Sequence, residues 1–303
     1  MDVCLLGTGG VMPLPGRWLS SVLIRYNGKM LLIDCGEGTQ VPVRMAGWGF
    51  KAIDAVIFTH YHGDHIAGLP GLLLTIGNSE RTEPLTLAGP PGLADVIAGL
   101  TVIAPELPYK LQLIELPDDR EAGICLNGLV INSIPVDHTV TCLGYSVVLK
   151  RQGKFNAERA KELNIPVQYY RKLQNGHEVT IGDRVIRPDM VIGPERKGIK
   201  ICYCTDTRPT DRIVGFARDA DLFICEGMYG NNEDMEKAIR KKHMTFTEAA
   251  EIAKKARVRE LWLTHYSPSL TEPGKYIGQA ADIFPNAVIG TDLHVKTLKY
   301  DSE

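Results

Sequence analysis

The chain has 303 residues, of which 44% are hydrophobic and 23% charged, and its formal net charge of −2 is ordinary for a globular protein. We predict a cytoplasmic protein without a membrane segment, because no basic leader opens the chain and no apolar run approaches roughly 18 residues. The seven cysteines are scattered without a Cys-x-x-Cys pair, which favours buried free thiols over disulfides or a zinc ribbon.

Short apolar runs rich in β-branched residues predict strands in both halves of the chain. In chain order these runs are residues 3–6, 21–26, 30–33, 55–58, 129–134, 143–149, 200–204, 222–225 and 260–264. Helical periodicity appears at residues 93–100 and 245–256, and Thr245 and Glu248 have the spacing of a capping box. Strands with interspersed helices in each half predict a layered α/β sandwich.

Residues 60–65 hold the densest set of chemically active side chains. They read His60-Tyr61-His62-Gly63-Asp64-His65 and directly follow the predicted strand at 55–58. A lone His is more often a core or surface residue, but three imidazoles and a carboxylate at this density suit a divalent metal ion such as zinc. The sequence therefore predicts a metal site on a loop between a strand and a helix.

Three further side chains of the same kind follow apolar strand runs. His138, Asp206 and His265 come directly after the predicted strands at 129–134, 200–204 and 260–264. We expect them to converge with residues 60–65 at one edge of a sheet.

The segment from residue 150 to residue 200 differs from the rest of the chain. It contains twelve Lys and Arg against six Asp and Glu, and it has a short helical pattern at 157–163 but little apolar periodicity to bury. A basic segment on an acidic remainder predicts an arm that faces a polyanion. A solvated surface loop is the alternative.

The order of these motifs resembles that of the metallo-β-lactamase superfamily. More narrowly, it resembles the ribonuclease Z family, endonucleases that trim the 3′ end of precursor tRNA. The supporting motifs run from residue 5 to residue 267 and include Thr8-Gly9 and the segment Ile33-Asp34-Cys35-Gly36-Glu37-Gly38-Thr39-Gln40. The resemblance implies an αββα sandwich that forms a single domain over residues 1–303. A protruding, flexible basic arm would be inserted at residues 150–198 as an exosite for RNA.

The resemblance also implies two divalent metal ions. The first would be held by His60, His62 and His138, and the second by Asp64, His65 and His265. Asp206 would bridge the two ions. Zinc is the leading candidate, and manganese and iron stay open because His and carboxylate ligands accept all three. Superfamily members with redox di-iron centres have Glu at the position of His62, so this imidazole favours hydrolysis.

Two residues outside the metal set are implied to be catalytic. The family carries a His-Glu-Ala-Thr motif, of which only Glu226 is present here, and a His-x-Thr motif that His243-Met244-Thr245 matches. His243, oriented by Glu226, would protonate the leaving oxygen, and Asp64 would also accept a hydrogen bond from the attacking water. Without the resemblance, His243 would be interpreted as a surface or helix-capping residue.

The resemblance places RNA contacts in the arm and in one loop. Arg171 and Lys172 would bind phosphates of the tRNA elbow, and Tyr169 and Tyr170 would stack on bases or sugars, although packing within the arm is an equal alternative. The family's Pro-x-Lys-x-Arg-Asn loop here reads Pro13-Leu14-Pro15-Gly16-Arg17-Trp18, so Arg17 and Trp18 are candidates for acceptor-stem contacts. The arm's usual Pro-Pro-Gly-Pro reads Pro166-Val167-Gln168-Tyr169.

The leading hypothesis is a homodimeric endonuclease that removes the 3′ trailer of precursor tRNA or cleaves another RNA phosphodiester. A phosphodiesterase or ester hydrolase with a smaller substrate is the alternative, because the loop at 13–18 departs from the family pattern. A metal-storage or RNA-binding protein without turnover is a third hypothesis, and the complete ligand set argues against it.

Overall fold

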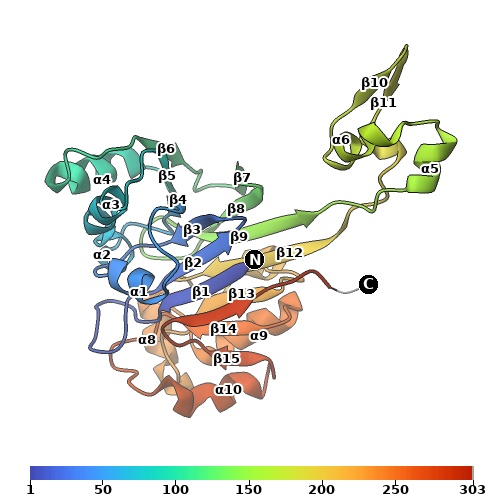
Figure 1. Cartoon of the computed structure of the whole chain (residues 1–303). Helices are drawn as coiled ribbons and strands as arrows, with labels where there is room; N and C mark the ends of the chain where they lie inside the picture. The colour runs from blue at the N-terminus through green and yellow to red at the C-terminus, as the bar shows by residue number, and fades with distance from the viewer. Residues whose placement is uncertain (302–303) are drawn as a thin grey trace. The chain divides into compact units, whose positions relative to one another are not determined.

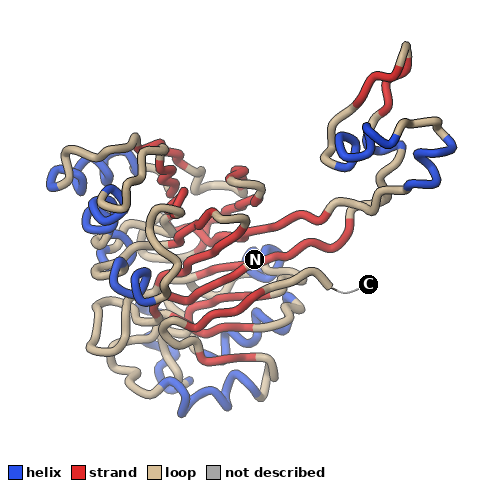
Figure 2. Tube along the Cα trace, in the orientation of Figure 1, coloured by secondary structure: helices blue, strands red, loops and turns tan. Residues whose placement is uncertain are grey.

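The structure, a computed structural model, describes residues 1–301, which divide into two compact units. The main unit comprises residues 1–148 and 200–299, and the inserted unit comprises residues 149–199 with residues 300–301. Strands dominate the main unit, whereas the inserted unit consists of short helices and one hairpin (Figure 2).

The main unit is built on two seven-stranded sheets. The strands of the first sheet, in spatial order, are β16 (His294–Thr297), β1 (Asp2–Gly7), β2 (Ser21–Tyr26), β3 (Lys29–Ile33), β4 (Ile53–Ile57), β5 (Leu85–Gly89) and β6 (Leu111–Glu115). Those of the second sheet are β15 (Ala287–Ile289), β14 (Leu261–Thr264), β13 (Leu222–Glu226), β12 (Arg196–Cys204), β9 (Cys142–Arg151), β8 (Leu129–Val136) and β7 (Ala122–Leu126).

The central strands read as continuous apolar runs because both of their faces are covered. Cys4 and Leu6 of β1 face the helices that cover the first sheet. Leu5 lies on the opposite face, where a Cβ on Gly290, just after β15, would meet it at 2.6 Å. Tyr145 of β9 donates a hydrogen bond to the carbonyl oxygen of Phe58 at 2.7 Å, which also joins the two sheets.

Helices cover the outer faces of both sheets (Figure 1). Those against the first sheet are α1 (Gln40–Met45), α3 (Leu69–Gly77) and α4 (Leu93–Leu100). Those against the second sheet are α7 (Asp211–Phe216), α9 (Phe246–Ala256) and α10 (Ile277–Ala281). The one-turn α2 (Gly63–Ile66) and the helix α8 (Met235–Lys241) lie in loops beside the sheets. The predicted αββα sandwich is confirmed.

Every predicted strand run of the main unit overlaps an observed strand, and both of its predicted helices are present. At the start of α9, the Thr245 hydroxyl accepts from the backbone N–H of Glu248, and the Glu248 carboxylate accepts from that of Thr245, so the predicted capping box is confirmed. All seven cysteines are free; six are buried, but Cys125 is exposed, which the sequence interpretation missed. No helix within residues 1–301 combines the length and apolar character needed to cross a membrane.

The inserted unit has a small hydrophobic core of its own. Its elements are α5 (Ala157–Glu162), α6 (Tyr170–Gln174) and the hairpin of β10 (Val179–Ile181) with β11 (Arg184–Ile186). The buried core residues are Ala160, Ile165, Leu173, Val179, Ile186 and Val191. The expectation of little to bury was wrong, because each short element contributes one or two residues and no periodic pattern results.

Candidate metal centre

The seven predicted metal ligands all lie within three residues of the end of a strand or at the start of α2. His60 follows β4, and His62 is the residue that precedes α2, which carries Asp64 and His65. His138, Asp206 and His265 follow β8, β12 and β14. Asp206 and His265 have positive φ angles of 49° and 59°, so the backbone turns sharply where each strand ends. The fold brings all seven side chains together in two groups.

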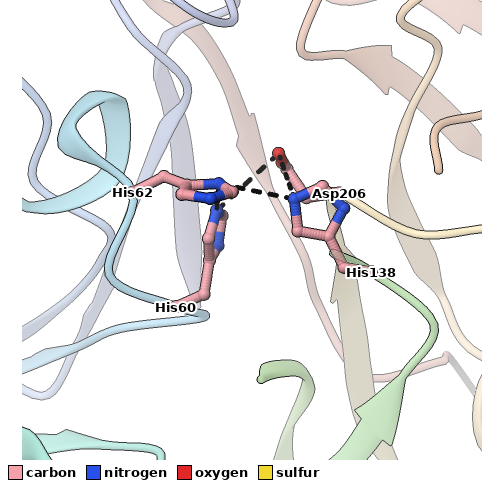
Figure 3. Close-up of side chains that lie close together, drawn as sticks. All are labelled: His60, His62, His138 and Asp206. Atoms are coloured by element: carbon pink, nitrogen blue, oxygen red, sulfur yellow. Dashed lines mark hydrogen bonds and ion pairs between the residues drawn. The ribbon is translucent and has the colours of Figure 1, made fainter. Parts of the chain in front are cut away.

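The first group consists of His60, His62, His138 and Asp206 (Figure 3). His62 Nδ1 lies 3.0 Å from His60 Nε2 and 3.4 Å from His138 Nε2. Asp206 Oδ2 lies 3.7 Å from Nε2 of both His60 and His138. Four ligand atoms from three separate segments therefore surround one point.

The second group consists of Asp64, His65 and His265. Their ligand atoms lie 3.2–3.6 Å apart, with His65 Nε2 and His265 Nε2 at the shortest separation. The other carboxylate oxygen of Asp206, Oδ1, lies 3.3 Å from His65 Nε2 and 3.1 Å from His265 Nε2. Asp206 thus presents one oxygen to each group.

Both groups fit divalent metal ions in spacing and in ligand chemistry. In a tetrahedral site with bonds of about 2.0–2.2 Å, ligand atoms lie roughly 3.3–3.6 Å apart, which is close to the separations in both groups. All of the donors are imidazole nitrogens or carboxylate oxygens, which suit zinc and similar ions. The residues present could therefore hold metal ions without rearrangement of the backbone.

The charge states of the ligands also suit a cation. Burial lowers the pKa of His60 well below its usual value, so its imidazole is neutral and can bind a metal. Burial raises the pKa of Asp206, but the surrounding His265 and His65 outweigh it and hold that pKa well below its usual value. For His65, burial lowers the pKa, but Asp206 and Asp34 raise it more. The same negative potential would attract a metal cation.

Asp34 orients one of the ligands, a role that the sequence interpretation did not assign. Its Oδ2 lies 2.9 Å from His65 Nδ1, which leaves Nε2 of that ring facing the second group. Asp34 also accepts from the N–H and hydroxyl of Thr59 and from the hydroxyl of Tyr203, and it is fully buried. Such carboxylate–histidine contacts set the tautomer and direction of a metal-binding ring. Its place just after β3 was the available signal.

The loop after β1 packs directly against the second group. The backbone N–H of Val11 donates to Asp64 Oδ2 at 2.7 Å, although Val11 has a φ of 71°, which is unusual for a β-branched residue. A Cβ at Gly10 would lie only 2.6 Å from the His265 ring, so this position accommodates glycine alone. The loop thereby helps to hold two ligands in place.

His243 and Glu226 form a pair beside the ligands. His243 Nδ1 lies 3.2 Å from Glu226 Oε2, and the fully buried Glu226 also accepts from the N–H groups of Thr207 and Met244. Burial lowers the pKa of His243, but the charge and hydrogen bond of Glu226 raise it more, to about 9. The His243 ring stacks on His265 with centroids 5.6 Å apart. A protonated His243 can therefore donate a proton next to the ligand groups.

Both groups open into one cavity of about 300 Å³. Its lining includes several predicted ligands, His243 and four residues that the sequence interpretation did not select, namely Val11, Thr139, Met228 and Lys241. The strand-end pattern could not indicate these four, because none of them directly follows a strand or belongs to a ligand motif.

The predicted RNA-contact residues have different surroundings. Arg17 donates to the carbonyl oxygens of Leu270 and Thr271 at 2.8 and 2.9 Å, and a Cβ on Gly38 would meet the Trp18 ring at 3.1 Å.

In the inserted unit, the ring of Tyr170 packs on Phe155 with centroids 4.7 Å apart, and Tyr169 joins the same core. These contacts favour the packing alternative for the two tyrosines. Arg171 and Lys172 are exposed.

Comparisons with known proteins agree over the whole chain. A model of the metallo-beta-lactamase superfamily matches residues 19–153, and a beta-lactamase superfamily domain model matches residues 189–266. The chain is 55% identical to Ribonuclease Z of Lachnoclostridium phytofermentans over 301 residues, which cover 99% of each chain. It is 57% identical to Ribonuclease Z of Lachnospira eligens over 304 residues, which cover 100% of this chain and 99% of the relative.

Solved structures show the same fold. The short form of human tRNase Z superposes with a TM-score of 0.72 at 26% identity, covering 99% of this chain and 100% of that one. The metallo-beta-lactamase fold protein YhfI of Bacillus subtilis superposes with a TM-score of 0.71 at 21% identity, covering 97% and 98% of the two chains, which supports the fold alone.

Proposed function

Because this chain belongs to the ribonuclease Z family of the metallo-β-lactamase superfamily, we propose that it is a metal-dependent endoribonuclease that removes the 3′ trailer of precursor tRNA. The full-length identity to relatives named Ribonuclease Z supports this function over a phosphodiesterase of smaller substrates. The complete ligand set beside a proton donor supports an enzyme over a metal-storage protein.

The position of Asp206 is the observation that carries this proposal. One of its carboxylate oxygens faces each ligand group, which supports two ions bridged by Asp206. Two divalent cations, when bound, would supply an activated water and neutralise charge on the phosphodiester. We propose zinc for both, since the donors are imidazoles and carboxylates, and manganese or iron would also be accepted.

The chain's own residues have separate roles in this reaction. Asp64 accepts a hydrogen bond from the attacking water, besides its contact with Val11, and thereby orients that water. His243 donates its proton to the leaving oxygen, while Glu226 holds the ring through Nδ1 so that the other nitrogen can face the cavity. The imidazoles of the two ligand groups act only as metal ligands.

We propose that the inserted unit is the arm that binds tRNA. Twelve Lys and Arg against six Asp and Glu over residues 150–200 support electrostatic binding of RNA, and Arg171 and Lys172 are exposed for it. Arg17 and Trp18 are proposed to contact the acceptor stem, and Tyr169 and Tyr170 to contribute through the arm. The family relationship supports a homodimer in the cytoplasm, and sedimentation analysis of the purified protein would test the dimer.

The function is tested by incubating purified protein with a precursor tRNA that carries a 3′ trailer, in the presence of zinc or manganese. Denaturing gels should show one cleavage near the mature 3′ end, and the product should be absent with a chelator or with Asp206→Ala. An intact precursor, together with metal-dependent cleavage of bis(p-nitrophenyl) phosphate, would replace this function by the alternative of a small-substrate phosphodiesterase.

A further inference from the structure

Two uncommitted hydrogen-bond donors lie at the cavity that holds the metal ligands. Lys241 ends α8, and Thr139 follows the ligand His138; both side chains are exposed and both line the cavity. Within residues 1–301, no ion pair or hydrogen bond engages the Lys241 ammonium or the Thr139 hydroxyl. Every other charged group or imidazole in that lining belongs to the ligand groups or is His243.

The neighbouring Lys242 differs, because its ammonium is committed. Lys242 Nζ lies 2.6 Å from Asp137 Oδ1 and 3.3 Å from the carbonyl oxygen of His138. The carbonyl oxygen of Lys242 in turn lies 3.3 Å from His138 Nδ1. Three contacts thus tie residues 137–138 to Lys242, although Lys242 has a φ of 57°, which costs a residue with a side chain some strain.

This clamp places Thr139 and Lys241 on two segments that are joined at their neighbours. The rings of His138 and His243, next along those segments, have centroids 5.3 Å apart. An ammonium and a hydroxyl held together at the mouth of a cavity suit a phosphate oxygen, because both donate and the ammonium adds charge. The scissile phosphate would be bound by the metal ions, so these two donors are available for another phosphate.

We propose that Lys241 and Thr139 form a subsite for an RNA backbone phosphate next to the scissile phosphodiester. The subsite rests on the proposed function, since it assumes an RNA substrate at this cavity. It provides a cation at a chain position unrelated to the loop at 13–18, where the family pattern has a Lys and this chain has Pro15. In the competing interpretation, Lys241 only interacts favourably with the C-terminal end of α8.

Arg240 offers a matched control. It is the preceding residue of α8, carries the same charge and is exposed, but it does not line the cavity. Arg240→Ala and Lys241→Ala therefore remove one positive charge each from the same helix. Only the second would remove a phosphate contact.

The test measures binding of fluorescent precursor tRNA to metal-loaded protein by anisotropy, in a His243→Ala background that slows cleavage. We expect Lys241→Ala to raise the Kd about tenfold and to reduce the slope of log Kd against log salt by about one between about 50 and 200 mM KCl. Lys241→Arg should restore the affinity to within about twofold, and Thr139→Val should raise the Kd about threefold with the slope unchanged.

Equal effects of Lys241→Ala and Arg240→Ala on Kd and slope would overturn the subsite, as would a loss of affinity that accompanies a lower melting temperature in Lys241→Ala alone. Unchanged affinity of Thr139→Val would overturn the part assigned to the hydroxyl. Failure of the proposed function is distinguishable, because the wild-type protein itself would then leave precursor tRNA uncleaved.

Discussion

At the scale of single residues, the centre depends on which ring nitrogen each His presents. His65 points Nε2 at the second ligand group because Asp34 occupies its Nδ1. His62 instead presents Nδ1 to the first group, and His138 presents Nε2 while its Nδ1 faces the carbonyl oxygen of Lys242. Partners outside the ligand set therefore determine which nitrogen of His65 and His138 can bind a metal.

Replacing Asp34 tests this dependence. Asp34→Asn should weaken metal binding by about 10–100-fold, because an amide orients the His65 ring less firmly than a carboxylate does. Competition with a chelator measures the affinity. The control is Asp119→Asn, which changes an exposed carboxylate and should leave the affinity unaltered. Equal affinities in the two variants would contradict the role of Asp34.

His65 and His243 should fail in different ways when each is changed to Ala. His65→Ala should lose both bound metal and turnover, because a ligand nitrogen is removed. His243→Ala should keep its metal and lower the single-turnover rate by about 10²–10⁴-fold, the range of a general acid.

Metal content by mass spectrometry and single-turnover cleavage of precursor tRNA measure the two effects. If both variants lost metal equally, His243 would belong with the ligands rather than with Glu226.

At the scale of elements, Arg208 connects the turn that follows β12 to the start of α9. Its guanidinium forms an ion pair with Glu248, the carboxylate of the capping box, and donates to the carbonyl oxygen of His243 at 2.5 Å. Both partners of the ion pair are mostly buried. One side chain thus links the Asp206 turn, the His243 backbone and the first turn of α9.

Arg208→Met should lower the free energy of unfolding by about 1–3 kcal/mol, because it leaves a carboxylate and a carbonyl without their donor. It should also lower kcat, since the His243 backbone loses a contact. Urea unfolding of the metal-loaded protein and steady-state cleavage measure the two effects.

Arg257→Met removes a comparable ion pair with Asp219 that is more than half exposed, and it should change stability by less than about 0.5 kcal/mol. Similar effects of the two Arg variants would show that the Arg208 contacts do not stabilise the junction.

Prediction of elements from sequence succeeded where burial on both faces produces long apolar runs, as in β2 and β13. It missed β6, whose alternate residues are exposed, and the three-residue β15, because neither leaves an apolar run of sufficient length. The same limit explains why the core of the inserted unit was not predicted. Its elements of three to six residues are too short to show a period.

At the scale of the whole molecule, the chain separates into a unit that carries the ligands and an inserted unit proposed to bind tRNA. Arg171→Ala with Lys172→Ala should weaken tRNA binding and reduce its salt slope by about two, because two exposed cations of α6 are removed. The catalytic rate at saturating substrate should stay the same. Anisotropy at several salt concentrations and steady-state kinetics measure these quantities.

Lys254→Ala with Lys255→Ala is the matched control, since it removes two exposed cations from the last turn of α9 in the main unit. A salt slope that is the same in both double variants would remove the inserted unit from tRNA binding.

The sequence by itself determined the fold class, the donor types of the centre and their distribution over strand ends, because these are properties of local pattern and residue chemistry. Only the tertiary structure decided that Asp206 presents one oxygen to each ligand group and that Asp34 holds His65. The same holds for Thr139 and Lys241, which share a cavity although about 100 residues separate them. Such contacts depend on the packing of segments that are remote in sequence, and no local pattern encodes them.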